Sequence, residues 1–150
     1  MTLISLILVS LLSGSPQCNC KTVPANETSH GANEFVLHAD IKVNRIAGKL
    51  LLAGDPVNEA IIEVFNYPSS STDYKDVNAA LYYYKKRRAA CLTGEDGAFC
   101  FNKFPPGSYL LRAGTRKSSG INQIHAIITV LPKNQKAPTG ELELRLTPGT

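Results

Sequence analysis

Short β-prone runs separated by turn signals follow one another through most of this sequence. Over residues 35–43 every second side chain is apolar, which is the period of a strand that buries one face. Gly-Asp-Pro at 54–56 and Pro-Pro-Gly at 105–107 are strong turn signals between later runs. Those runs lie at 46–52, 60–66, 89–93, 98–101, 108–114, 121–131 and 141–146. Strands this short and this closely spaced predict an all-β, antiparallel sandwich in which two sheets pack face to face.

Chain length and charge narrow the class of protein. A chain of 150 residues has room for one domain with one sizeable core. The 16 Lys and Arg residues against 12 Asp and Glu give a formal net charge of +4, which is too mild a bias to predict nucleic-acid binding. The densest basic run, at 85–88, is interpreted as solvated sequence beside a surface insertion, with a patch for an anionic partner as the alternative.

The first residues predict export. Residues 3–12 form an apolar run that suits the core of a signal peptide and is shorter than the ~20 residues that span a bilayer. We therefore predict a signal peptide over roughly residues 1–20 and no transmembrane anchor. Residues 21–34 are polar and lack periodicity, which predicts a tail in front of one domain at 35–150. The expected location is secreted, or periplasmic and at the cell envelope.

The four cysteines indicate one disulfide. Two β-prone segments flank the turn at 94–97, whose glycines favour a hairpin. A symmetric turn sets Cys91 opposite Cys100 at a distance that suits a disulfide, so we predict a Cys91–Cys100 bridge. Cys18 and Cys20 lie near the expected processing site, where they are removed or remain as free thiols. Lipidation of Cys18 is a further alternative, although the preceding Ser-Pro-Gln departs from the usual small-residue motif.

No arrangement of residues in the sequence predicts catalysis. There is no His-Glu-x-x-His, no Gly-x-Ser-x-Gly and no glycine-rich phosphate loop in front of a helix. The histidines His30, His38 and His125 lack metal-ligand spacing, and His125 is expected on the outer face of its strand. Glu95 and Asp96 are interpreted as solvated turn residues and not as a calcium or acid–base site. We therefore expect no catalytic residue, no metal and no cofactor.

Tyrosines cluster in and near the insertion at 67–88, whose second half is compatible with helix or strand. They predict either a contact surface for a partner or an insertion folded back over the edge of the sandwich, because Tyr combines apolar area with a hydrogen-bonding tip. The tyrosines concerned are Tyr67, Tyr74, Tyr82, Tyr83 and Tyr84. The chain has no Trp, the residue that sugar-binding sandwiches most often use for stacking.

Three segments together resemble the carboxypeptidase regulatory-like domains. Residues 46–64 (IAGKLLLAGDPVNEAIIEV) are similar to the first two strands of that family, which run hydrophobic-x-Gly-x-Val and then Gly-x-Pro-Val-x-x-Ala-x-Val-x-Val. Residues 93–101 (TGEDGAFCF) resemble its third hairpin, and residues 104–111 (FPPGSYLL) resemble the Leu-Pro-Pro-Gly-x-Tyr segment that follows. The resemblance spans about residues 46–146 and departs from the family in the insertion and in the cysteine pair.

The resemblance implies a fold and a class of function. The fold is a seven-stranded antiparallel Greek-key β-sandwich of the prealbumin type, with the insertion between its second and third strands. No catalytic residues are implied, since in metallocarboxypeptidases this domain accompanies the catalytic domain. We therefore expect a non-catalytic exported module with a structural or protein-interaction role at the cell envelope. Carbohydrate binding is the alternative, so the expected partner is a protein or a polysaccharide.

Overall fold

The computed structural model of the chain is all-β. It describes residues 18, 20–32, 35–67, 87–102, 104–138 and 140–149, with the backbone alone at 35–37 and 39. Within these ranges there is no helix, and so none that is long and apolar enough to cross a membrane. The strands are β1 Lys21–Thr22, β2 Phe35–Val43, β3 Ala47–Leu52, β4 Asp55–Pro56, β5 Ile61–Asn66, β6 Arg87–Leu92, β7 Ala98–Cys100, β8 Gly107–Gly114, β9 Ile121–Val130 and β10 Leu142–Pro148.

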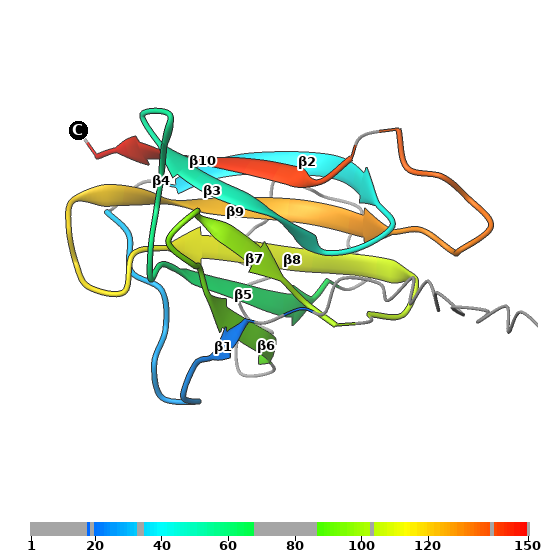
Figure 1. Cartoon of the computed structure of the whole chain (residues 1–150), viewed down its shortest axis with the longest axis horizontal. Helices are drawn as coiled ribbons and strands as arrows, with labels where there is room; N and C mark the ends of the chain where they lie inside the picture. The colour runs from blue at the N-terminus through cyan, green and yellow to red at the C-terminus, as the bar shows by residue number, and fades with distance from the viewer. Residues whose placement is uncertain are drawn as a thin grey trace, which may run out of the picture.

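The strands form one curled mixed sheet, a half-barrel (Figure 1). In one part, which we call the large sheet, β1, β6, β5, β8 and β9 follow one another, and β2 pairs with the far side of β9. In the other part, the small sheet, β3 bonds to β10, β4 and β7. Two residue pairs, Asn122–Thr147 and Ile121–Pro148, join β9 to β10 and so connect the two parts.

The strand positions predicted from the sequence are confirmed to within a few residues, but the purely antiparallel arrangement is wrong at two pairings. β2 runs parallel to β9, and β10 runs parallel to β3. The reason is that the chain passes from one sheet to the other at the short connection between β2 and β3. These two strands are consecutive in the sequence but lie in different sheets. Each takes a neighbour from the distant C-terminal strands, so chain direction no longer has to alternate.

The turn at 94–97 is present, but the strands on its two sides separate. Gly94 N–H donates to the Ala98 carbonyl at 3.1 Å, and Gly97 N–H, with φ at 75°, donates to the Gly94 carbonyl at 2.9 Å. β6 then pairs with β5 in the large sheet, whereas β7 pairs with β3 in the small sheet. This turn therefore connects the two sheets and does not close a hairpin.

Alternate side chains from both sheets fill the interior of the half-barrel. The inward residues of β9 and β10 are Ile124, Ala126, Ile128, Val130, Leu142, Leu144 and Leu146. This is the period-two pattern of the sequence, and burial of one face fixes the register of each strand. Gly48 lies where the β3 and β10 backbones approach closely, since a Cβ there would overlap the Leu142 carbonyl.

Residues 20–32 are not the tail that their polar composition predicted. β1 pairs with β6, the His30 backbone bridges to Thr115, and Ala32 N–H donates to the Ile121 carbonyl at 2.9 Å. The segment thus crosses the outer face of the large sheet from β6 to the start of β9. We call residues 20–32 the N-terminal strap. Its polar groups are used in bonds to the sheet, which is why it lacks the apolar periodicity of a strand.

We predict that Gly48→Ala lowers the free energy of unfolding by about 2 kcal/mol or more, because the added Cβ would overlap backbone atoms that cannot rotate away. Urea denaturation measures the change. Gly140→Ala is the matched control, since an added Cβ meets nothing within 4 Å there, and its effect should stay below about 0.5 kcal/mol. Equal stability of the two variants would contradict the close approach of β3 and β10.

Candidate functional site

A buried carboxylate lies at the centre of the outer face of the large sheet. Glu63 is in the middle of β5, where the side chains of Ile62 and Val64 belong to the core, so its own side chain points outward. The N-terminal strap crosses the sheet at this point, and Glu63 is 0% exposed. A carboxylate this deeply buried needs hydrogen bonds and a counter-charge.

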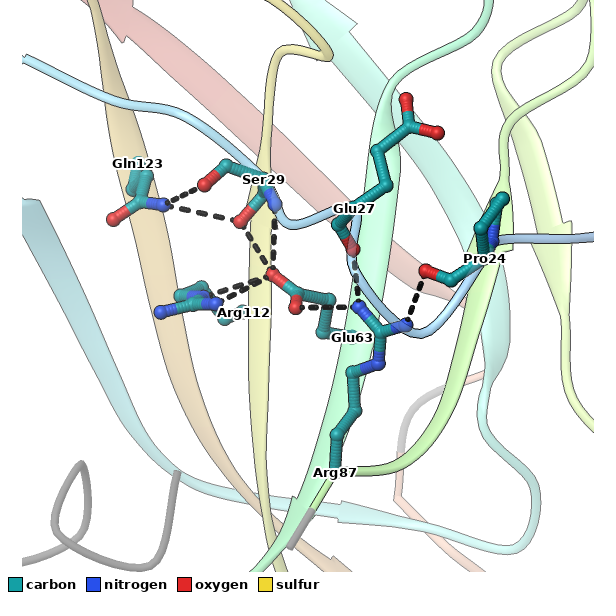
Figure 2. A network of polar contacts seen from close by, with 7 residues as sticks. All are labelled: Pro24, Glu27, Ser29, Glu63, Arg87, Arg112 and Gln123. Carbon is teal, nitrogen blue, oxygen red and sulfur yellow. Dashed lines mark hydrogen bonds and ion pairs between the residues drawn. The ribbon is translucent and has the colours of Figure 1, made fainter. Parts of the chain in front are cut away.

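Two arginines and the strap supply the hydrogen bonds and the counter-charge that Glu63 needs (Figure 2). Oε1 of Glu63 accepts hydrogen bonds from the Ser29 hydroxyl at 2.6 Å, from the Ser29 backbone N–H at 3.1 Å and from Arg112 Nε at 2.9 Å. Oε2 accepts from Arg87 Nη1 at 3.1 Å. Arg112 lies directly opposite Glu63 on β8, and Arg87 comes from β6 on the other side of β5. The carboxylate is therefore held between guanidinium groups from both neighbouring strands.

The same groups fix the strap to the sheet. Arg87 donates to the backbone carbonyls of Glu27 and Pro24, at 2.6 and 2.9 Å. Gln123 of β9 donates from Nε2 to the carbonyl and the hydroxyl of Ser29, at 3.0 Å each. We call Glu63, Arg87, Arg112, Ser29 and Gln123 the Glu63 network. Because it connects four strands with the strap, its evident role is to hold the strap in place.

His125 lies beside the Glu63 network, opposite Arg112 in the β8–β9 register. It is on the outer face of β9, as predicted, but it is 2% exposed and not solvated. Burial lowers the pKa of His125 to about 4, and the positive charge of Arg112 acts in the same direction, against a smaller opposite effect of Glu63. The imidazole is therefore neutral at pH 7.

All four cysteines are paired, and the predicted Cys91–Cys100 bridge is wrong. Cys18 is bonded to Cys100 and Cys20 to Cys91, with Cα–Cα distances of 5.1 and 5.5 Å. The physical reason is the separation of β6 and β7, which leaves each strand's cysteine facing the N-terminal segment. One bridge ties this segment to the small sheet and the other ties it to the large sheet. Cys18 is therefore neither a free thiol nor available for lipidation.

Tyr67 does not contribute to the predicted tyrosine surface. It is buried and belongs, with Phe65, Leu110 and Ile127, to a small cluster on the outer face of the large sheet. The other members of that predicted surface, Tyr74, Tyr82, Tyr83 and Tyr84, lie outside the described residues, as does the insertion from 68 to 86.

The remaining singled-out residues do not come together. His30 and His38 are exposed, and Glu95 and Asp96 are exposed turn residues, of which Asp96 accepts a bond from the Ala98 N–H at 3.1 Å. Of the basic run at 85–88, Arg88 is exposed as predicted, whereas Arg87 is half-buried and is part of the Glu63 network. Across the part of the chain that the structure describes, no group of three His, Cys, Asp or Glu side chains could hold a metal ion.

A cleft of about 510 Å³ opens at one end of the half-barrel, the right-hand end in Figure 1. We call it the basic cleft, and its characteristic lining residues are Arg45, Ile46, Phe101, Phe104, Leu131 and Lys133. They come from the β2–β3 turn, from the β7–β8 connection and from the segment after β9. None of the described residues that line it is acidic, whereas Glu59, Glu95 and Asp96 line a cleft of about 520 Å³ at the 94–97 turn.

Sequence reasoning missed the Glu63 network, although the sequence carries a signal for it. Glu63 is the single charge in the run 60–66, and Arg112 is the single charge in the run 108–114. A lone charge in an otherwise apolar strand is expected to be paired when it is buried. Two such runs with opposite charges therefore predict that the strands are neighbours, as β5 and β8 are.

Comparison with known proteins identifies no family. No protein-family model matches the sequence, and no curated protein is significantly similar to it. Among solved structures, the chain is similar to 3-chlorocatechol 1,2-dioxygenase from Rhodococcus opacus 1CP, with a TM-score of 0.37 and 13% identity, over 94% of this chain and 69% of that one. A likeness this weak carries no argument about fold or activity. The resemblance to the carboxypeptidase regulatory-like domains stays a prediction.

We predict that Glu63→Gln lowers the free energy of unfolding by about 3–5 kcal/mol, because it leaves Arg87 and Arg112 buried without a negative charge. Urea denaturation measures the loss. The control is Glu143→Gln, which breaks an exposed ion pair with Arg145 and should cost less than about 1 kcal/mol. If both variants lose the same small amount, the Glu63 network does not stabilise the fold.

We also predict that the protein loses stability in mild acid. Because the pKa of His125 is about 4 in the folded protein and 6.5 ordinarily, the unfolded chain binds a proton between these values and the folded protein does not. The contribution is complete above pH 6.5 and is lost as the pH falls towards 4, by up to about 3 kcal/mol. Unfolding free energies measured across this range should give a flatter curve for His125→Gln. The exposed-site control His38→Gln should keep the wild-type slope, and an unchanged slope in both variants would refute the prediction.

Proposed function

We propose that the chain is an exported, non-catalytic β-domain with a structural or protein-interaction role at the cell envelope. The observation that carries this proposal is the pairing of all four cysteines in two disulfides. Disulfides persist in secreted and periplasmic proteins and are rare in the reducing cytosol. The apolar run at residues 3–12 supports the same route.

The cross-links also support a processing site in front of Cys18. A signal peptide that ended at residue 20 would remove both cysteines that bond to β6 and β7. The cut that keeps both bridges lies between the apolar run and Cys18, which shortens the expected signal peptide by a few residues.

The state of the buried charges supports a non-catalytic role. Both oxygens of Glu63 are bonded to donors from the strap and from two arginines, and the carboxylate is enclosed. Its charge serves to hold Ser29 and the strap against the sheet. Tyr67 is buried and offers no stacking face to a sugar, so we keep a protein as the proposed partner and a polysaccharide as the alternative.

The finer fold assignment belongs to the same proposal. The chain would be a relative of the carboxypeptidase regulatory-like domains in which the prealbumin-type Greek key has opened into a half-barrel. Support comes from the segments that carry the resemblance, since β3 and β5 are strands, 94–97 is a turn and Pro105 and Pro106 precede β8. Gly48, the glycine of the first motif, lies where two backbones approach closely.

The test is a disulfide map of the mature protein purified after expression of the full chain in a secretory host. We expect an amino terminus between residues 13 and 18, and linked peptides that contain Cys18 with Cys100 and Cys20 with Cys91. The double variant Cys20→Ser/Cys91→Ser opens a loop of 71 residues and should lose about 2–5 kcal/mol of stability. An unprocessed chain with four free thiols would overturn the proposal.

A further inference from the structure

The basic cleft has a pre-formed apolar wall. Phe104 is half-buried and packs edge-on against Phe101, with ring centroids 6.0 Å apart, and against Tyr109 at 5.1 Å. The Tyr109 hydroxyl donates to the Pro105 carbonyl at 2.6 Å, which fixes the connection that carries Phe104. The interplanar angle of Phe101 and Phe104 is 77°, so the two rings make a corner and not a flat platform.

The basic cleft continues into two neighbouring clefts that are also basic. A cleft of about 360 Å³ shares Phe101 and Phe104 with it and adds Arg88. On the other side, a cleft of about 340 Å³ shares Lys133 and adds Lys136. None of the described residues that line the three clefts is acidic. Because they share lining residues, the three clefts adjoin one another and together are lined by aromatic rings and by four basic side chains.

The arginines of this surface lack carboxylate partners. Elsewhere in the molecule, Arg87, Arg112, Arg116 and Arg145 each form an ion pair with a glutamate. Arg45 and Arg88 form none with any residue that the structure describes. Arg45 instead donates to the sulfur atoms of Cys18 and Cys100, which are weak acceptors that position the guanidinium without neutralising it.

We propose that these three adjoining clefts bind an extended acidic peptide segment of a partner protein, one that carries a large apolar side chain. The inference rests on the proposed function and names the chemistry of its partner. Charge complementarity to Arg45, Arg88, Lys133 and Lys136 selects the acidic segment. The corner between Phe101 and Phe104 takes an inserted side chain, whereas a sugar ring needs a flat exposed aromatic face. Three clefts that adjoin one another give several successive side chains of an extended segment a place to bind.

The test is a fluorescence anisotropy titration of the mature protein with a fluorescein-labelled peptide in which four aspartates flank one tryptophan. We expect binding in low salt that weakens as ionic strength rises to about 0.15 M. Lys133→Glu and Arg88→Glu should each weaken binding about tenfold. The matched control Lys117→Glu makes the same charge change in the β8–β9 connection at the opposite end of the half-barrel and should change binding less than about twofold. Urea denaturation of each variant checks that it is folded.

Two further probes separate the parts of the inference. The same peptide with glycine in place of tryptophan should bind at least about tenfold more weakly, because it cannot fill the corner. An oligogalacturonate, an anionic sugar chain, should bind more weakly than the tryptophan peptide.

Three results would overturn the inference: no binding at about 1 mM peptide, an equal loss in Lys117→Glu, or tighter binding of the sugar. A chain that passes the disulfide map but does not bind leaves the proposed function standing. If a chain with free thiols binds the peptide, that result contradicts only the proposed export and leaves the peptide-binding inference standing.

Discussion

The burial of one carboxylate between two guanidinium groups determines how this half-barrel is covered. Glu63 is fully enclosed, and removing a charge from water costs several kcal/mol unless partners restore its interactions. Arg87 and Arg112 more than balance it, which leaves an excess positive charge. Backbone carbonyls of the strap compensate this excess, because Arg87 also donates hydrogen bonds to the carbonyls of Pro24 and Glu27. The polar groups of the strap therefore help to compensate the buried charges, and the strap crosses the sheet where Glu63 lies.

Covalent and non-covalent attachments hold the strap at different points. The bond of Cys20 to β6 fixes the first residue of the strap, the bond of Cys18 to β7 holds the chain just before it, and the Glu63 network fixes the strap near Ser29. Steric fit completes the contact, since a Cβ on Gly114 would overlap the His30 carbonyl and a Cβ on Gly31 would overlap the Gln123 side chain. Glycines on both partners thus let the strap lie flat on the sheet. A segment without apolar periodicity is ordered by these contacts and not by a hydrophobic face of its own.

The sequence predicts strands well and their partners poorly, and the reason is physical. Apolar runs and period-two alternation are local properties, so the limits of β5, β8 and β9 could be read directly from the sequence. Pairing depends on where the chain changes sheet, and the turn at 94–97 has the same residues whether it closes a hairpin or joins two sheets. The error in the cysteine pairing follows from that one ambiguity. The pairing of Glu63 with Arg112 could have been predicted from the sequence, because lone opposite charges in two apolar runs constrain which strands are neighbours.

Both faces of the large sheet are covered by other parts of the chain, so the ends of the half-barrel are where a partner can bind. The inner face of the large sheet packs against the small sheet, and its outer face holds the strap and the buried cluster around Phe65 and Tyr67. The two ends differ in charge, with Glu59 and Asp96 at the 94–97 turn and Arg45 and Lys133 at the basic cleft. The fold pairs the arginines that hold the strap, whereas Arg45 at the basic cleft and Arg88 beside it form no ion pair with any carboxylate that the structure describes. An unneutralised charge beside a rigid apolar corner favours a partner that brings both an acid and an apolar group.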